Sequence, residues 1–196
     1  MDIHKHDTIR LSHDNNLIVY KMSQKITSWL LDYYHQEIVI VCIGTDRSTG
    51  DALGPLIGTA LQKYSLKNIS VYGTLHQPIH ALNLTEQLMD IYRQHSNPFV
   101  IAIDACLGKL TSVGDIIAGV GSIKPGAAVN KQLPSVGDMY LTGVINVSGF
   151  LEYTVLQSTR LSLVVDMANT IARIIHAIDR HLSVKLPSRQ SKNNIS

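Results

Sequence analysis

Two uninterrupted runs of apolar, mostly β-branched residues constrain the fold of this chain more than any other feature. The runs cover residues 38–43 and 99–103. A strand with one solvent-exposed face alternates apolar and polar residues. These runs do not alternate, so we expect strands that are covered on both faces, as in a parallel sheet. A shorter strand over residues 69–72 and helix-type apolar spacing before and after it complete an alternation of strands and helices, which predicts an α/β fold with a mostly parallel sheet.

The length and composition fit one domain. The chain has 196 residues and 45% of them are apolar, which is enough to bury a sizeable core. We expect a polar, partly flexible segment over residues 1–22, a single α/β domain over residues 23–186 and a disordered tail over residues 187–196. Ser23 is predicted to cap the first helix of the domain.

The C-terminal half departs from the regular alternation. Further strands are predicted over residues 115–120 and 140–147, with an irregular stretch containing Pro and Gly between them. A long helix from Leu161 to Leu182 carries an unusually broad apolar stripe. Such a stripe predicts deep packing in the core or contact with a partner subunit, and we expect a homo-oligomer.

Charge and cysteine content exclude several classes of partner. The net charge is only +2, from 17 basic and 15 acidic residues, and without a basic stripe we expect no nucleic-acid partner. The two cysteines, Cys42 and Cys106, lie in or beside apolar runs, which is typical of a reducing compartment such as the cytoplasm. The N-terminus lacks the apolar stretch of a signal peptide and the uninterrupted apolar runs are strand-length, so no membrane span is expected.

The two buried strands are each followed by an aspartate. Open parallel sheets bind ligands outside the carboxyl ends of their strands, which is where Asp51 and Asp104 are expected to lie. Two close carboxylates do not both ionise readily, so one takes up a proton and the pair becomes an acid and a base able to hydrolyse an amide. The pair could instead hold a divalent metal. Asp51 alone also fits a helix cap, whereas a carboxylate that ends a buried strand, such as Asp104, has no routine structural role.

Further residues of the same loops are candidates for substrate binding. They belong to the polar loop after the first strand, to the loop around Gln77, and to the irregular stretch after residue 120. The candidates are Gly44, Asp46, His76, Lys124 and Gly126. The alternative interpretation is structural: a glycine for a tight turn, and solvated side chains for the histidine and the lysine.

Several short segments resemble motifs of one protease family. Gly50–Pro55 and Ala102–Ala105 resemble the two active-site motifs of the bacterial germination protease, an aspartic-type endopeptidase that degrades small acid-soluble spore proteins. Ile123–Gly126, followed by Val129–Lys131, resembles a third stretch of that family. As a whole the chain resembles the small YyaC-type sporulation proteins.

This resemblance implies a fold and a function. It implies a phosphorylase/hydrolase-like three-layer α/β/α sandwich, with Asp51 and Asp104 as the catalytic pair. It also implies a sporulation-associated peptidase in the forespore or mother cell of a spore-forming bacterium, with a protein or peptide substrate such as small acid-soluble spore proteins. An alternative, motivated by the broad apolar face of the last helix, is a non-catalytic sporulation factor that binds a protein partner.

A more distant resemblance is to the hydrogenase maturation peptidases. In that family a carboxylate at each of the two aspartate positions binds nickel, and a histidine from the Pro-Gly region is the third ligand. Here that region offers Lys124 and no histidine, and the first strand ends in Gly44-Thr45-Asp46, where the relatives usually have Gly-Asn. A metal-dependent, maturation-type hydrolase therefore stays an alternative, and we expect no cofactor.

Overall fold

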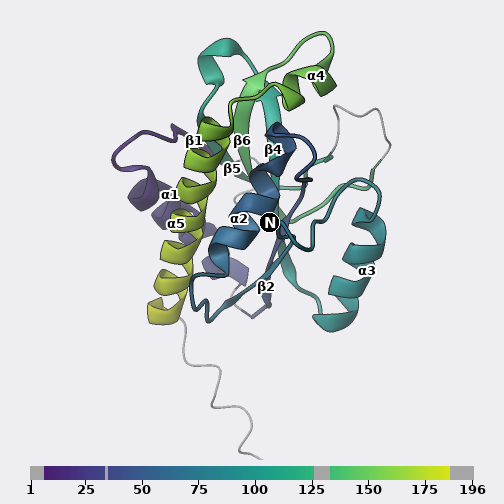
Figure 1. The fold of residues 1–196 in the computed structure, drawn as a ribbon. Coiled ribbons are helices and arrows are strands. Elements are labelled where there is room, and N and C mark those ends of the chain that lie inside the picture. Colours follow the sequence, from purple (N-terminus) through teal and green to yellow (C-terminus); the bar gives the residue numbers. More distant parts are fainter. Residues whose placement is uncertain (1–6, 34, 126–132, 186–196) are drawn as a thin grey trace, which may run out of the picture.

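The computed structural model describes residues 7–33, 35–125 and 133–185. Its centre is a six-stranded sheet with the strand order β1-β5-β6-β4-β2-β3 (Figure 1). The strands are β1 (Thr8–Ser12), β2 (Ile38–Cys42), β3 (Ile69–Tyr72), β4 (Phe99–Gly108), β5 (Asp115–Val120) and β6 (Met139–Val147). The helices are α1 (Ile18–Leu30), α2 (Leu53–Leu61), α3 (Leu84–Gln94), α4 (Glu152–Gln157) and α5 (Leu161–Lys185), with short 3₁₀ helices η1 (Leu31–Tyr33), η2 (Gly50–Ala52) and η3 (Leu110–Ser112).

The pairings fix the direction of each strand. β2 runs parallel to β3 and to β4, and β4 runs parallel to β6. β5 is antiparallel to both β6 and β1, so β1 points the same way as β6. Among the described strands, β5 alone is reversed. The predicted α/β fold with a mostly parallel sheet is confirmed, and β5 and β6 match the strands expected in the C-terminal half.

Helices cover both faces of the sheet, which explains why the central strands do not alternate. Along β2, Ile38 and Ile40 belong to a larger core shared with α1, α2 and α5. Val39 and Val41 point to the opposite face and join a smaller core closed by α3. Figure 1 shows these layers, with α3 on one side of the sheet and α1, α2 and α5 on the other. All residues of β2 are buried, as a strand between two helical layers must be.

The domain begins earlier than predicted. β1 pairs with β5 at the edge of the sheet, and its residues Ile9 and Leu11 pack against the larger core. α1 already starts at Ile18, which is buried. The expectation of a polar, partly flexible segment over residues 1–22 is therefore wrong from residue 8 onward, because the two apolar side chains of a short polar strand find partners in the sheet.

The role predicted for Ser23 is also wrong. Ser23 lies within α1 and is buried, and its hydroxyl donates a hydrogen bond to the carbonyl of Tyr20 at 3.1 Å. A serine inside a helix commonly satisfies its hydroxyl on the preceding turn in this way. Leu17 occupies the N-cap position, where no side-chain capping bond forms.

The long helix α5 is part of the core. It has 25 residues, and an 18-residue window within it has a mean hydropathy of 1.4, so length and composition alone would allow it to cross a membrane. The expectation of no membrane span stays a prediction. In the structure its apolar stripe packs on α1, α2 and the sheet. The carboxylate of its buried Asp179 accepts hydrogen bonds from the backbone N–H groups of Lys67 and Asn68, at 3.1 and 2.7 Å. Deep packing, one of the two alternatives for this stripe, is what the structure shows.

Candidate active site

The candidate site lies where β2 ends and β4 continues. The last paired residues of the two strands are Cys42 and Ile103, so Asp104 is the first residue of β4 beyond the end of β2. On its other side β4 is still paired, and Thr142 of β6 is the register partner of Asp104. The sequence predicts that this strand ends at Asp104, but pairing with β6 carries it on to Gly108. The carboxylate of Asp104 thus projects from a strand that is paired with β6 on one side only.

The backbone places Asp51 at the same end of the sheet. After β2 the chain turns at Gly44, whose N–H donates to the Ile79 carbonyl at 2.8 Å. The N–H of Thr45 then donates to the carbonyl of Asp51 at 3.1 Å, which closes the loop. Asp51 lies in η2, just before α2, and neither helix start has a side-chain capping bond. The interpretation of Asp51 as a helix cap is therefore not supported, which leaves its carboxylate for another role.

Both carboxylates line the same two cavities. The first cavity has a volume of about 330 Å³, and the second has about 340 Å³. Asp51, Asp104 and Leu156 line both, so the cavities adjoin at the aspartate pair. The other residues of the first cavity are Ile43, Gly44, Thr45, Arg47, Ser48, His80, Ala81, Leu82, Pro125, Leu133 and Tyr153. Those of the second are Ala105, Cys106, Leu107, Ile123, Lys124, Thr142 and Glu152.

The environment of the pair favours a proton on Asp51. Burial raises the pKa of the Asp51 carboxyl above its usual value, while the nearby Ser48 hydroxyl acts in the opposite direction. Although Ser48 is close enough to influence that pKa, its hydroxyl makes no hydrogen bond to any described residue. The carboxylate of Asp104 is oriented by the N–H of Ala105, which donates to Oδ1 at 2.9 Å. The two aspartates are therefore held in unlike environments.

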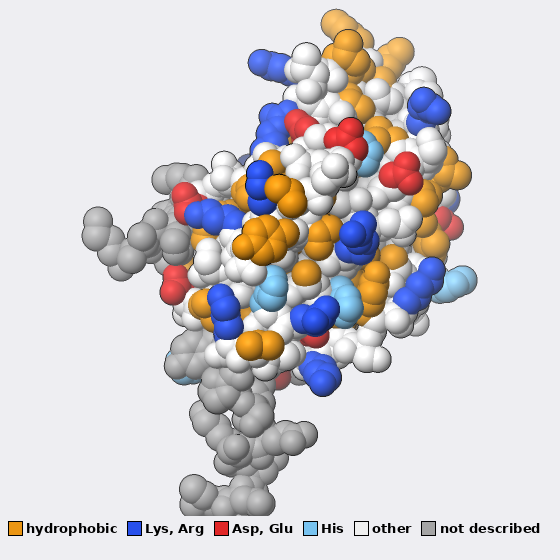
Figure 2. Space-filling model, turned by 90° about the vertical axis from the view of Figure 1, so that its left-hand side faces the viewer, with side chains coloured by type: hydrophobic (Ala, Val, Ile, Leu, Met, Phe, Trp, Pro, Cys, Tyr) orange, Lys and Arg blue, Asp and Glu red, His pale blue; other side chains and the backbone are white. Residues whose placement is uncertain are grey.

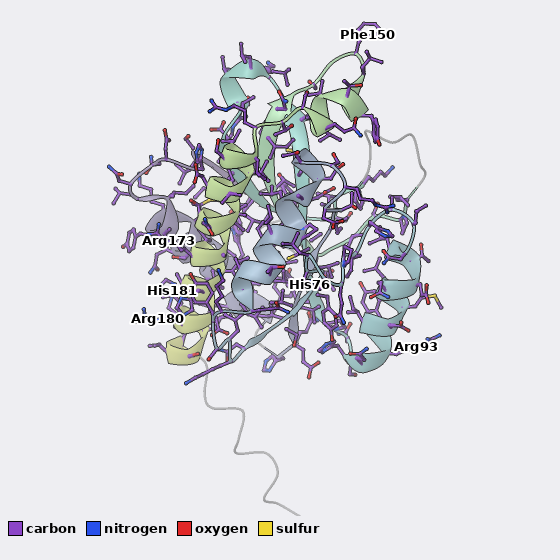
Figure 3. The ribbon with its side chains drawn as sticks, in the orientation of Figure 1. His76, Arg93, Phe150, Arg173, Arg180 and His181 are labelled. Atoms are coloured by element: carbon purple, nitrogen blue, oxygen red, sulfur yellow. The ribbon has the colours of Figure 1, made fainter. Side chains whose placement is uncertain are left out.

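The structure separates the predicted substrate-binding residues. Gly44 lines the first cavity and Lys124 lines the second, where it is exposed. Asp46 and His76 are exposed and line neither cavity. Figure 3 shows His76 near the middle of the molecule, away from the end that carries Phe150. Gly126 lies outside the described residues.

His80 takes the place expected for His76. The backbone N–H of His80 donates to the side-chain oxygen of Asn83 at 2.8 Å. The preceding residue, Ile79, forms a parallel β-bridge with Ile43, which holds this loop against the end of β2. This anchoring brings His80 to the first cavity and leaves His76 in solvent. Sequence spacing could not distinguish the two histidines, because the bridge depends on tertiary contacts.

Sequence reasoning also missed the contribution of α4. Tyr153 and Leu156 line the first cavity, and Glu152 lines the second. The side chain of Asn146, on β6, donates to the Val155 carbonyl at 3.2 Å and so fixes α4 over the end of the sheet. No local sequence signal marks this helix as part of a site.

Cys106 lines the second cavity and is not an activated nucleophile. Burial raises the pKa of its thiol above the usual value, and the nearby carboxylate of Asp104 adds to the increase. The thiolate is the reactive form of cysteine, so this environment disfavours nucleophilic chemistry at Cys106.

No group of three or more His, Cys, Asp or Glu side chains within residues 7–33, 35–125 and 133–185 is arranged to hold a metal ion. Lys124, which lines the second cavity, brings a positive charge to that side of the pair. What the site offers is an aspartate pair with unlike surroundings at the junction of two cavities. Such a pair can activate a water molecule and protonate a leaving group.

A family model and one relative match most of this chain. A family model described as "Protein of unknown function (DUF1256)" matches residues 10–174. The "Uncharacterized protein YyaC" of Bacillus subtilis (strain 168) is 50% identical over 170 residues, which cover 87% of this chain and 83% of the relative.

Two solved structures are similar to this chain with much lower sequence identity. The [NiFe] hydrogenase maturation protease HycI from Thermococcus kodakarensis KOD1 has a TM-score of 0.47 and 17% sequence identity, and the match covers 74% of this chain and 93% of that one. The hydrogenase maturating endopeptidase HybD from E. coli has a TM-score of 0.37 and 16% identity, over 76% of this chain and 91% of that one.

Proposed function

The chain belongs to the DUF1256 family, and we propose that it is a peptidase in which Asp51 and Asp104 hydrolyse a peptide bond. The observation that carries the proposal is that both carboxylates line the same two cavities at the carboxyl end of the sheet. This is the end at which open parallel sheets bind their ligands. The raised pKa of Asp51 supports a division of roles between the two groups.

In the proposed mechanism Asp104 is the base and Asp51 is the acid. The carboxylate of Asp104 takes a proton from a water molecule, whose oxygen attacks the carbonyl carbon of the scissile bond. The protonated carboxyl of Asp51 gives its proton to the amide nitrogen, and the carbon–nitrogen bond breaks. The products are a carboxylic acid and an amine. Proton exchange with water returns Asp104 to the ionised form and Asp51 to the protonated form.

The finer assignment rests on the motif resemblance. Gly50–Pro55 and Ala102–Ala105 resemble the active-site motifs of the germination protease, and we extend the proposal to an aspartic-type peptidase that acts on a spore protein, such as small acid-soluble spore proteins. The corresponding setting is the cytoplasm of a sporulating cell. A homo-oligomer is part of the same proposal.

The experiment is a cleavage assay with matched variants. Purified protein is incubated with small acid-soluble spore proteins and with casein from acid to neutral pH, and fragments are identified by mass spectrometry. We expect wild-type protein to cut and Asp104→Asn to lose activity by about 10³-fold or more, because the base is removed. Asp46→Asn, in the loop between β2 and η2 but exposed and outside both cavities, is the control and is expected to keep activity. Cleavage by Asp104→Asn at the wild-type rate would refute the mechanism.

A second candidate is a non-catalytic protein that binds a partner at the same end. The observation in its favour is the exposure of large apolar side chains on the segment that leads into α4, where Phe150 is 99% and Leu151 is 75% exposed. This second function is correct if the wild-type protein cuts nothing and two binding results hold. The Phe150→Ser variant must lose a sporulation partner, and the Asp51→Asn/Asp104→Asn double variant must still bind that partner.

A further inference from the structure

The two cavities that meet at the aspartate pair differ in chemistry. Among the side chains that line only the first cavity, several are large and apolar, including Leu82, Leu133 and Tyr153. The second cavity has a larger polar share of its surface, and Thr142, Glu152 and Lys124 line it. A ligand that lies across the pair therefore meets large apolar side chains beside Arg47 and His80 on one side, and a more polar surface on the other.

The mouth of the first cavity is itself apolar and exposed. Leu82 is 73% exposed and Tyr153 is 55% exposed, although both line the cavity. Phe150 and Leu151 precede Tyr153 in the chain and are more exposed still. Figure 3 places Phe150 at the tip of the molecule above α4, and Figure 2 shows hydrophobic side chains gathered at that same end. Contiguous exposed apolar side chains beside a cavity are typical of a binding site.

Ser48 gives independent evidence that a polar ligand group enters the first cavity. Its side chain lines the cavity and is 5% exposed, and its hydroxyl lies beside the Asp51 carboxyl, whose pKa it lowers, without forming a well-aligned hydrogen bond within the described part of the chain. A buried hydroxyl without a partner is unfavourable, and native proteins rarely retain one without a reason. A substrate that brings a backbone carbonyl or N–H group to this position would satisfy it.

We infer that the substrate is an extended polypeptide that places an apolar side chain in the first cavity, between Leu82 and the α4 residues Tyr153 and Leu156, while Ser48 hydrogen-bonds its backbone. The cleavage step of this inference rests on the proposed function, but the binding step does not. Leu82, Tyr153 and Leu156 determine the specificity for the apolar side chain, and Ser48 is a positioning residue. The preferred cleavage site is thus adjacent to a large apolar residue.

The test measures binding without cleavage. The Asp51→Asn/Asp104→Asn double variant is titrated with two labelled peptides of about ten residues, long enough to cross both cavities when extended. The peptides are identical except for a central Leu or Ser, and binding is followed by fluorescence anisotropy. We expect the Leu peptide to bind about tenfold more tightly or better, because an apolar pocket discriminates by this amount or more. Equal affinity for both peptides, or binding of neither, would overturn the inference.

Two tyrosines of similar exposure provide a matched control. Tyr153 on α4 is 55% exposed, and Tyr92 on α3 is 53% exposed and lines neither cavity. In the inert background, Tyr153→Ser is expected to reduce the preference for the Leu peptide about tenfold, and Tyr92→Ser is expected to leave it unchanged. An equal effect of the two substitutions would place the apolar recognition elsewhere and contradict the inference.

Ser48→Ala separates positioning from structural support. If Ser48 contacts the substrate backbone, Ser48→Ala weakens both peptides by the same factor, about three- to tenfold. The free protein should then be nearly as stable as wild type, because the substitution removes a hydroxyl that forms no well-aligned hydrogen bond in the free protein. Lower stability with unchanged peptide binding would show a structural role and would overturn this part of the inference.

Cleavage data distinguish failure of the inference from failure of the proposed function. If the inert variant prefers the Leu peptide but wild-type protein cuts nothing, the apolar recognition stands and the peptidase proposal fails. If wild-type protein cuts at sites with no enrichment of large apolar residues, the peptidase proposal stands and the inference fails. Cleavage next to large apolar residues, lost in Asp104→Asn, supports both.

Discussion

The backbone of Gly44 approaches Asp51 so closely that a Cβ atom on Gly44 would lie 1.9 Å from the Asp51 carbonyl oxygen. The same Cβ atom would lie 2.9 Å from the ring of Pro55. Gly44 also has a φ of 146°, which side chains rarely adopt. This contact holds the loop after β2 against the start of α2 and so sets the position of the Asp51 carboxylate.

We predict that Gly44→Ala destabilises the protein by about 3 kcal/mol, because neither a backbone carbonyl nor a proline ring can move aside cheaply. Peptidase activity is expected to fall as well, since the loop must shift and carry Asp51 with it. Urea denaturation measures the first effect and the cleavage assay measures the second.

Gly121→Ala is the control for this prediction. Gly121 also has a positive φ, 124°, but nothing lies within 4 Å of an added Cβ atom. The substitution should therefore cost only the backbone strain, about 1–2 kcal/mol. If both variants lose the same stability, the close approach to Asp51 is not what makes glycine necessary at position 44.

The hydrogen bonds of Asp179 predict a second large effect on stability. This carboxylate is buried on α5 and accepts the backbone N–H groups of Lys67 and Asn68 ahead of β3. Asp179→Ala leaves those N–H groups without an acceptor, and we expect a loss of about 2–4 kcal/mol in the free energy of unfolding. Asp166→Ala, at an exposed position on the same helix, should change it by less than about 0.5 kcal/mol. Similar losses in the two variants would contradict this account.

A third prediction compares two polar contacts near the C-terminal end of α3. His95 is 14% exposed and lies 2.6 Å from a Glu37 carboxylate oxygen and 2.8 Å from the Tyr72 hydroxyl. The ion pair between Arg93 and Asp90 is 3.0 Å long, but the arginine side chain is 70% exposed. Partly buried hydrogen bonds outweigh exposed ion pairs, so His95→Phe should cost about 1–2 kcal/mol and Arg93→Ala about 0.5 kcal/mol or less. Thermal or urea unfolding of the two variants measures the difference, and the reverse order would show that solvent screens the His95 contacts too.

The sequence was most informative where burial alone decides the structure. The continuous apolar runs predicted β2 and the first half of β4, because only a strand between two helical layers tolerates such a run. It was least informative at the edge of the sheet. The half-buried strand β1 has only Ile9 and Leu11 packed on the core, and its partner β5 is about a hundred residues away.

The same distinction holds for the candidate site. Asp51 and Asp104 were predicted because each follows a buried strand, and the rule on the carboxyl ends of strands brings them to one edge. Ser48, His80 and Tyr153 were not predicted as site residues. Their place in the first cavity depends on the turn at η2, the bridge beside Ile43 and the packing of α4, which are tertiary contacts.

The last prediction concerns pH and follows from the raised pKa of Asp51. Burial disfavours the charged carboxylate in the folded protein, so between the usual value of 3.8 and the raised pKa the folded state binds more protons than the unfolded state. The stability that protonated Asp51 contributes is therefore complete below pH 3.8 and is lost as the pH rises through the raised pKa.

Asp51→Asn cannot titrate, so its stability relative to wild type should increase with pH across that window and then stay constant. Urea denaturation of both proteins from about pH 3.5 to about pH 8 measures the difference. In the proposed mechanism Asp51 must be protonated, and wild-type cleavage should therefore decline over the same pH range in which the stability difference grows. Parallel stability curves for the two proteins would show that burial does not shift this group. Cleavage that rises with pH through the window would assign the acid role to a group other than Asp51.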